Sequence, residues 1–333
     1  MRRLVLKSVV AALAVLAVGT ASAQVKERTL KLGIQNPKGH PAELGAQKLA
    51  EIVAAKSGGK MKVRVFSGGQ LGGDAQTVSA LQGGTVEMTI LNSGILGAQV
   101  KDFEVYDFPF MFANSSEADT VLDGPFGKGL HAKLEAKGIV GLGYWELGFR
   151  NLTNARKSIQ KVEDIAGLKL RVIPNPINLD WVKALGANPV PLAFPEVYTA
   201  LETKAIDGQE NPVTVIHANK FNEVQKYLTL TRHQYNPQSI IVSKKVWDTF
   251  SADEKKIVSD AAAEAIKYER QLTREQEAQA LDALKKAGME VTELPPAEVA
   301  KLREKMAPVI DKYAAAMPDT VAALKAELAK LRK

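Results

Sequence analysis

Strand-like and helix-like segments alternate in the first third of the chain, and this alternation limits the possible folds more than any other feature. Segment 29–35 (TLKLGIQ) alternates as a half-buried strand does, and the following PAELGAQKLAEIVAAKS carries apolar residues at helical spacing. The strand-like MKVRVF, a glycine-rich turn, a helix through Leu81 and the strand-like VEMTILN repeat this unit. Strands separated by helices form a mostly parallel sheet that helices cover on both faces. The sequence therefore predicts an α/β fold.

A second set of strand and helix patterns occupies the middle of the chain. It runs through IVGLGYWELGFRNLTN, LKLRVI, a helix from about Asn178 to Leu185, NPVPL, a helix from about Pro195 to Lys204, and AIDGQEN. A chain of 333 residues is long enough for roughly two domains of about 150 residues each. We therefore expect two α/β lobes.

One helical pattern is unusually long. It extends from Ala252 to about Ala287, with no proline or glycine before Gly288. A helix of this length measures about 50 Å at about 1.5 Å per residue, which is longer than one small lobe. We expect this helix to span both lobes.

The N-terminal residues have the pattern of a cleaved signal peptide. MRRLVLK is basic, SVVAALAVLAVGT is apolar, and Ala21, Ser22 and Ala23 form a small-residue cleavage site. The apolar stretch is shorter than the roughly 20 residues that a membrane-spanning helix needs, and no later segment qualifies. We therefore predict that residues 1–23 are removed and that the mature protein, starting at Gln24, is periplasmic.

Charge and cysteine content exclude several classes of function. Signal cleavage would lower the formal net charge of +7 by three, and the remaining basic residues are dispersed. A Lys-rich tail, LKAELAKLRK, has the spacing of a solvated amphipathic helix rather than of a nucleic-acid patch. The chain has no cysteine, so disulfides, thiolate catalysis and Cys-ligated zinc are impossible.

Signals of catalysis are weak. GLGYWE has Glu146 where the third glycine of a dinucleotide fingerprint belongs, and GPFGKG has the wrong spacing for a phosphate loop. Neither HExxH nor G-x-S-x-G occurs, and the four histidines, His40, His131, His217 and His233, are scattered. The sequence predicts no catalytic residue, metal or cofactor, and an enzyme remains an unsupported alternative.

The glycine-rich segment SGGQLGGD permits two interpretations. Its backbone N–H groups would be able to cradle an anion, with Asp74 near the ligand. The interpretation that we favour is a tight strand-to-helix turn in which Asp74 is the N-cap.

Two arginines point more clearly to a ligand. In LKLRVIP, strand alternation places Leu170 and Val172 on one face and Arg171 on the other, which by itself would leave Arg171 exposed. Pro174 ends this strand, however, and ligands of open α/β sheets bind beyond the carboxyl ends of strands. A guanidinium there can hold a carboxylate through two parallel hydrogen bonds. Arg150, between the two sets of strands, would supply a second contact.

Several segments of the chain together resemble one protein family. The runs GFRNLTN, DIAGLKLRV, LGANPVPLAFPEVYTALETKAIDGQENP and FNEVQKYLTLTRH are similar to those of the extracytoplasmic solute receptors of tripartite ATP-independent periplasmic (TRAP) transporters, the dicarboxylate- and sialate-receptor family. The resemblance extends from Thr29 beyond Ala287. It implies a two-lobed periplasmic binding protein fold in which each lobe is a mixed sheet flanked by helices.

The resemblance also implies a set of ligand-binding residues. The carboxylate-clamping arginine of the family corresponds to Arg171, its supporting arginine to Arg150, and the asparagine of GQENP to Asn211. An aromatic wall corresponds to Phe194, and the polar contacts correspond to Gln35, Asn92, Ser93 and Asn175. From spacing alone, Asn211 is equally well explained as a helix cap and Phe194 as a core residue. Whether Trp145, Glu146, Tyr235 and Asn236 line the cleft stays open.

Departures from the family pattern bear on the ligand. Sialate receptors resemble AES where this chain has LNS, so that Asn92 replaces an acidic residue, and Gln35 replaces an asparagine. These changes argue against sialic acid. An uncharged, hydrogen-bonding wall suits hydroxyl groups, and no third cation is evident for a second carboxylate. We therefore prefer a hydroxylated monocarboxylate such as a sugar acid, with a C4-dicarboxylate or a 2-oxo acid as the alternative.

The resemblance completes the expected organisation. Lobe 1 would comprise residues 24–147 and about 237–272, and lobe 2 residues 148–236 and about 273–333 with the C-terminal helices. The partners would be a small organic acid and the small and large membrane subunits of a TRAP permease, with the receptor a monomer. A periplasmic enzyme would instead need His217 or His233, and a signalling module would bind a sensor protein.

Overall fold

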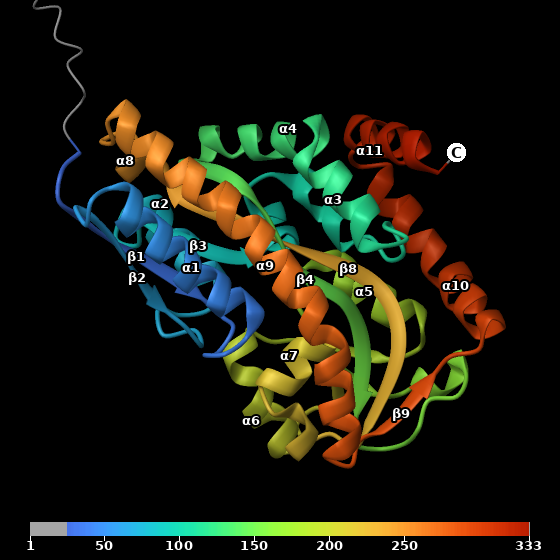
Figure 1. The fold of residues 1–333 in the computed structure, drawn as a ribbon. Helices are drawn as coiled ribbons and strands as arrows, with labels where there is room; N and C mark the ends of the chain where they lie inside the picture. Colours follow the sequence, from blue (N-terminus) through green and yellow to red (C-terminus); the bar gives the residue numbers. More distant parts are fainter. Residues whose placement is uncertain (1–24, 333) are drawn as a thin grey trace, which may run out of the picture.

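The computed structural model describes residues 25–332, which are built around one mixed sheet of nine strands (Figure 1). The predicted signal peptide lies outside the described residues. The strands are β1 (Arg28–Ile34), β2 (Met61–Phe66), β3 (Met88–Asn92), β4 (Ile139–Asn154), β5 (Lys169–Val172), β6 (Asn188–Pro191), β7 (Gly208–Asn211), β8 (Tyr227–Ser243) and β9 (Glu290–Glu293).

The strand order shows that one continuous sheet extends through both lobes. The order is β2-β1-β3-β8-β4-β7-β5-β6, and β9 pairs with β8. Strands β2, β1 and β3 are parallel and form the sheet of lobe 1, whereas β7, β5 and β6 are parallel and form that of lobe 2. Between them, β4 and β8 run antiparallel to each other along both lobes. The predicted α/β fold with a mixed sheet in each lobe is confirmed.

The two long strands change partners near Gly148: β3 pairs with β8 up to Gln238, opposite Trp145, and β7 pairs with β4 from Asn151. The β4–β8 register shifts between Glu146 and Gly148, so the strand has a bulge at this point. Gly148 has φ 111°, a conformation that side-chain-bearing residues rarely adopt. A bulge bends a strand and increases its twist. The connection between the lobes is therefore bent where the sheet changes strand partners.

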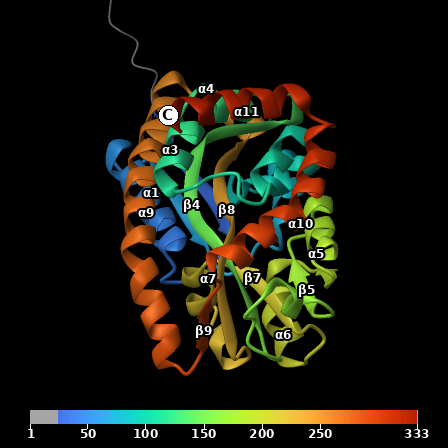
Figure 2. The same ribbon diagram turned by 90° about the vertical axis from the view of Figure 1, so that its right-hand side faces the viewer.

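Helices cover the sheet and connect its strands (Figures 1 and 2). They are α1 (Pro41–Lys56), α2 (Asp74–Gly83), α3 (Ser115–Asp123), α4 (Pro125–Lys133), α5 (Pro176–Ala184), α6 (Val197–Glu202), α7 (Val213–Ala218), α8 (Lys244–Trp247), α9 (Ala252–Lys286), α10 (Pro296–Ala314) and α11 (Pro318–Leu331). Short 3₁₀ segments at Ser93–Ala98 and Lys101–Asp107 connect β3 with α3.

The long helix α9 is a component of both lobes, as predicted. It begins at a capping box, in which the Ser251 side chain accepts from the Glu254 N–H group. Val258 packs in the hydrophobic core that contains α1, β1 and β3, and Leu284 packs in the core of α6 and α7. Figure 1 shows α9 running across the molecule from α8 to β9. One rigid element therefore connects the two cores.

The two C-terminal helices pack on different parts of the molecule. Helix α10 contacts α5 of lobe 2, and α11 contacts α3 and α4 beside lobe 1 (Figure 2). The C-terminal residues therefore touch both lobes. Within residues 25–332, no helix combines the length and the apolar character that a membrane crossing requires.

Candidate ligand-binding site

Side chains from both lobes enclose a cavity at the carboxyl ends of strands β1, β3, β5 and β7. Its lining consists of Gln35, Asn36, Asp74, Leu91, Asn92, Leu147, Arg171, Phe194, Asn211, Val215 and Gln238. The volume is about 20 Å³. This exceeds by only a little the roughly 10–15 Å³ that one water molecule needs. The two lobes are therefore closed tightly on each other at this place.

Arg171 is buried in this lining and has one unpaired donor. It lies on β5 between β6 and β7, and its exposure is only 2%, so strand alternation does not leave it at the surface. Its Nε and Nη2 atoms donate to the Leu192 carbonyl oxygen at 3.0 and 2.8 Å. Within residues 25–332, Nη1 has no hydrogen-bond partner. Burial lowers the pKa of Arg171 to about 10, so the side chain is still a cation at neutral pH.

Lobe 1 presents mainly acceptor oxygens to the same cavity. Among the described residues, the side-chain oxygens Gln35 Oε1, Asn92 Oδ1 and Gln238 Oε1 are buried without partners. Gln35 is fixed by donating through Nε2 to the Gly72 carbonyl oxygen at 3.0 Å, and Gln238 donates to Asn36 Oδ1 at 3.3 Å. A buried polar group without a partner costs about 1–3 kcal/mol. A ligand with hydroxyl donors would remove this cost.

Asp74 lines the cavity, but the predicted role of this residue as an N-cap is wrong. Gly73 is the N-cap of α2, and its N–H group donates to Gln76 Oε1 at 2.9 Å. Asp74 is the first helical residue, and its Oδ1 atom is buried and unpaired within the described part of the chain. Burial raises the pKa of Asp74 to about 7, although the charge of Arg171 opposes this shift. The glycines Gly72 and Gly73 precede the first turn of α2, and Asp74 in this turn lines the cavity.

Phe194 and Asn211 complete the lobe 2 side. The guanidinium of Arg171 lies 5.7 Å from the centroid of the Phe194 ring, within the range of a cation–π interaction. Phe194 also packs on Phe221, so it connects the cavity with the core of lobe 2. Asn211 donates to Gln209 Oε1 at 2.5 Å, and the N-cap of the following helix is Pro212 rather than Asn211.

Arg150 lies outside the lining and is fully paired. Its Nε and Nη2 atoms donate to the Glu210 carboxylate, and Nη1 donates to Asn236 Oδ1 at 2.6 Å. His233 Nε2 lies 3.4 Å from the same carboxylate. Burial acts to raise the pKa of Glu210, but Arg150 and His233 outweigh it and hold the pKa at about 2. Each guanidinium nitrogen of Arg150 therefore already has an acceptor inside the protein.

Two other predicted contacts also lie beside the lining rather than in it. Ser93 Oγ is 2.8 Å from Ser239 Oγ, and that hydroxyl is 3.0 Å from His131 Nε2. Asn175 is the N-cap of α5: its Oδ1 atom accepts from the Ile177 N–H group.

The four residues whose position was open are also outside the lining. Trp145 packs in the core of lobe 1, and Glu146 accepts from Arg274 at 2.7 Å. Tyr235 packs against Phe149, and Asn236 pairs with Arg150.

Two polar lining residues, Asn36 and Gln238, were missed by the sequence analysis. Asn36 follows Gln35 directly after β1, so the same end-of-strand argument applies to it. Gln238 lies opposite Asn92 in the antiparallel β3–β8 pair. That register depends on which distant strands pair, and no local pattern indicates it.

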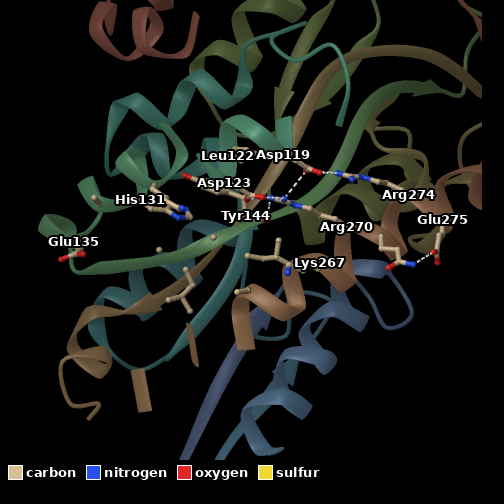
Figure 3. A pocket seen from close by; sticks show the side chains of 18 residues that line it. Asp119, Leu122, Asp123, His131, Glu135, Tyr144, Lys267, Arg270, Arg274 and Glu275 are labelled. Carbon is tan, nitrogen blue, oxygen red and sulfur yellow. Dashed lines mark hydrogen bonds and ion pairs between the residues drawn. The ribbon is translucent and has the colours of Figure 1, made fainter. Parts of the chain in front are cut away.

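A much larger cavity lies elsewhere, in a groove of about 870 Å³ between α9, α4 and β4. Figure 3 shows that Arg270 and Arg274 of α9 extend toward Asp119 and Asp123 of α3. Arg270 donates to Asp123 at 2.7 and 2.9 Å, and Arg274 donates to Asp119 at 2.7 Å. The arginines here are neutralised by carboxylates. This groove is therefore a poor site for an anion.

The Arg171 cavity combines a cation with hydrogen-bond acceptors, an arrangement that suits an organic acid. A cation from one lobe has a free donor, and the facing lobe supplies hydrogen-bond acceptors. Contacts to both walls exist only when the lobes are closed, so a ligand that makes them favours closure. The fold and this cleft define the class of two-lobed solute-binding proteins.

Comparison with known proteins identifies the family. Residues 32–316 match the model of the bacterial extracellular solute-binding proteins, family 7 (DctP). The C4-dicarboxylate-binding periplasmic protein DctP of Rhodobacter capsulatus is 36% identical over 87% of this chain and 88% of its own length. This chain therefore belongs to family 7, the TRAP solute receptors, and the predicted resemblance is confirmed.

Solved structures agree with this assignment. A TRAP periplasmic solute-binding protein from Ochrobactrum anthropi, with its C-terminus bound in the ligand-binding pocket, is 54% identical; the match covers 92% of this chain and 97% of that one, with a TM-score of 0.82. The sugar acid binding protein DctPAm from Advenella mimigardefordensis, in complex with galactonate, is 43% identical; the match covers 92% and 99%, with a TM-score of 0.90.

Proposed function

We propose that this chain is a periplasmic receptor that captures a hydroxylated monocarboxylate, such as a sugar acid, and delivers it to a TRAP permease. The observation that carries the proposal is the asymmetry of the cleft: lobe 2 presents the free Nη1 donor of Arg171, and lobe 1 presents oxygen acceptors, with no other partner for either among the described residues. In the proposal, Arg171 holds the carboxylate, and Gln35, Asn92 and Gln238 accept from hydroxyl groups. The similarity to a sugar acid binding protein in complex with galactonate supports this class of ligand.

The remaining residues of the site have secondary roles in the proposal. Phe194 covers the guanidinium face, and Asn211 donates to the ligand once its bond to Gln209 is exchanged. Arg150 acts as a supporting cation rather than a direct contact, because Glu210 and Asn236 already accept from it. Ser93 and Asn175 position the lining: Asn175 does so by donating to the carboxylate of Asp107 at 2.7 Å.

A C4-dicarboxylate is the second candidate, and the name of the Rhodobacter relative favours it. A second carboxylate, however, would face the oxygens of Asp74 and of the lobe 1 amides, and the described lining has no cation besides Arg171. A 2-oxo acid would leave the same acceptors without donors. A sugar acid would supply hydrogen-bond donors to more of the unpaired acceptors in the cleft than either alternative would.

The same lining argues for binding without turnover. Within residues 25–332, Asp74 is the one lining residue that would act as a nucleophile or base, and no serine, histidine or lysine accompanies it. We therefore propose a receptor and not an enzyme, exported by the predicted signal peptide and acting as a monomer. Lobes divided near residues 147, 236 and 272 would open to admit the acid and close on it, and the closed form would dock on the small and large permease subunits.

A thermal-shift screen tests the proposal. The mature protein, unfolded and refolded to remove carried-over ligand, is compared with and without galactonate, glucuronate, succinate, 2-oxoglutarate and benzoate. At 100 times its dissociation constant a ligand adds about 2.7 kcal/mol of stability, which is an easily measured shift. We expect the sugar acids to give the largest shifts. A shift with succinate alone would replace the sugar acid by a dicarboxylate, and no shift with any acid would refute the proposal.

A further inference from the structure

Two of the amides that line the Arg171 cavity lie where strand β3 ends. Asn92 is the last residue of β3, and Gln238 of β8 is its partner in the final pair of the β3–β8 register. Asn92 Oδ1 and Gln238 Oε1 have no hydrogen-bond partner among residues 25–332. These oxygens therefore do not fix the side chains themselves, and contacts behind the strand pair determine how firmly the two amides are held.

Three side chains form a hydrogen-bonded chain behind this pair. Ser239 follows Gln238 in β8, so its side chain points to the opposite face of the strand, and Ser93 follows Asn92 directly. Ser93 Oγ is 2.8 Å from Ser239 Oγ, which is 3.0 Å from His131 Nε2. Both serines are completely buried. The chain therefore connects the end of β3 to β8 and to helix α4.

The ring of His131 is held in one position by its neighbours. It stacks on Tyr144, with 3.9 Å between the ring centroids and an angle of 9° between the planes. Tyr144 lies opposite Ser239 in the β4–β8 pair, so this stacking holds the imidazole beside the serine hydroxyl. A Cβ atom at Gly141 of β4 would collide with the His131 ring, so the glycine permits this close approach.

His131 contacts the ligand site only through the two serines. It lines the groove of Figure 3, where its label lies beside Tyr144, and it is not part of the lining of the Arg171 cavity. Its side chain is 6% exposed, and burial lowers its pKa to about 3, so the ring is neutral at pH 7. It is therefore a hydrogen-bond partner of Ser239 and contributes no charge to the cleft.

We propose that His131 is a positioning residue for ligand binding, which holds the acceptor amides of Asn92 and Gln238 in place through Ser239 and Ser93. This inference rests on the proposed function, because the positions of the amides affect affinity only if hydroxyl groups of the acid donate to them. Groups that are fixed before binding lose less conformational freedom when the ligand enters. Loss of the chain should therefore weaken binding of a hydroxylated acid, although His131 touches neither the acid nor Arg171.

Two substitutions of His131 separate its hydrogen bond from the packing of its ring. His131→Phe keeps an aromatic ring against Tyr144 but removes the nitrogen beside Ser239, whereas His131→Gln keeps a polar group and loses the ring. In calorimetric titration with galactonate, the dissociation constant of His131→Phe should be weaker by roughly three- to tenfold, as for the loss of one hydrogen bond. His131→Gln should bind galactonate more tightly than His131→Phe does, even though the lost ring contacts lower its Tm further.

Ser239→Ala tests the chain itself, because it removes the hydroxyl between His131 and Ser93. It should weaken galactonate binding at least as much as His131→Phe does. The double variant His131→Phe, Ser239→Ala should be no weaker than Ser239→Ala, since the effects of residues in one hydrogen-bonded network are not additive. His217→Gln, at an exposed histidine of α7, is the matched control and should bind galactonate as the wild type does.

The outcomes separate this inference from the proposed function. If the wild type binds galactonate and His131→Phe binds it equally well, the inference is wrong and the proposed function stands. If His131→Gln binds more weakly than His131→Phe, affinity follows the packing of the ring, and a positioning role of the hydrogen bond is likewise refuted. If galactonate does not bind to the wild type, the sugar acid proposal fails, and this inference fails with it.

Discussion

Two buried arginines lie close to the junction of the lobes, and they differ in what surrounds them. Arg150 is completely buried, and all three of its guanidinium nitrogens donate to Glu210 or Asn236. Arg171 is 2% exposed, but its only described acceptor is the Leu192 carbonyl oxygen, and no carboxylate contacts it in residues 25–332. One cation is neutralised inside the protein, and the other is not.

In our proposal, this difference separates a structural ion pair, at Arg150, from a ligand-binding residue, Arg171. Burial alone does not distinguish them, because both arginines are buried. A buried charge is stable only if it is paired and hydrogen-bonded. Arg150 satisfies this condition within the folded chain, whereas we propose that Arg171 satisfies it when an anion enters the cleft. Stability should therefore depend on the first arginine and ligand affinity on the second.

The largest effect is expected at Arg150. Replacing Arg150 by methionine leaves the Glu210 carboxylate buried without its partner, which should lower the free energy of unfolding by about 3–5 kcal/mol. Urea denaturation at pH 7 measures this loss. A second variant, Arg150→Met with Glu210→Gln, removes both charges and should recover most of it. If Arg150→Met alone lost less than about 1 kcal/mol, the pair would be no more than a typical surface ion pair.

At Arg171 we expect the opposite pattern. Arg171→Met should weaken binding of the acid found in the screen by about 2–5 kcal/mol, or roughly 30- to several-thousand-fold, and should leave the urea midpoint nearly unchanged. Arg156→Met is the matched control, because that arginine is in the same lobe with a side chain that is 69% exposed. Calorimetric titration measures both affinities. If Arg171→Met bound the acid as tightly as the wild type does, the claim that Arg171 determines ligand affinity would be wrong.

Asp74 should make the ligand affinity of the Arg171 cavity dependent on pH. Its pKa of about 7 should rise further when a carboxylate enters beside Arg171, because the new negative charge opposes ionisation. Binding then takes up a proton, and affinity should fall as pH rises above 7, by at most about tenfold per pH unit. Calorimetry between pH 6 and about pH 9 measures the slope. Asp74→Asn should flatten it; an unchanged slope in that variant would exclude Asp74 as its source.

The smallest effect is expected at Phe194. A leucine there keeps the apolar wall but removes the aromatic face over Arg171, a loss of about 0.5–1 kcal/mol in affinity, or roughly two- to five-fold. The same titration measures it, with Phe194→Tyr as the control that preserves the ring. If Phe194→Leu bound as tightly as the wild type, the ring would serve only to pack against Phe221.

The fold was largely predictable because its signals are local. Alternating patterns predicted β1 to β3 and the strand of Arg171. An uninterrupted helical pattern predicted a helix from Ala252 to about Ala287, and α9 extends over Ala252–Lys286. Such patterns depend on which face of a helix or strand is buried, and the spacing of apolar residues within a short segment shows this face. The β4–β8 pair, in which two strands run through both lobes, depends on distant partners, and its register does not follow from local patterns.

The site was predictable only in part, for the same reason. The position of Arg171 at the end of a strand indicated its place in the cleft, but nothing in the sequence near Arg150 shows that Glu210, sixty residues later, pairs with it. Asp74 was assigned as a cap because its spacing fits one, yet Gly73 takes that role and turns the carboxyl toward Arg171. Gln238 was not predicted, because it comes to lie beside Asn92 only through the pairing of β8 with the distant strand β3.

A crystal structure of the protein with the acid that gives the largest thermal shift tests the central claim most directly. We predict that the carboxylate of the acid lies about 2.7–2.9 Å from Arg171 Nη1, with hydroxyl groups on the amides of lobe 1 and the Arg150–Glu210 pair intact. A carboxylate bound instead to Arg150, or to Arg270 and Arg274 in the groove of Figure 3, would contradict the account.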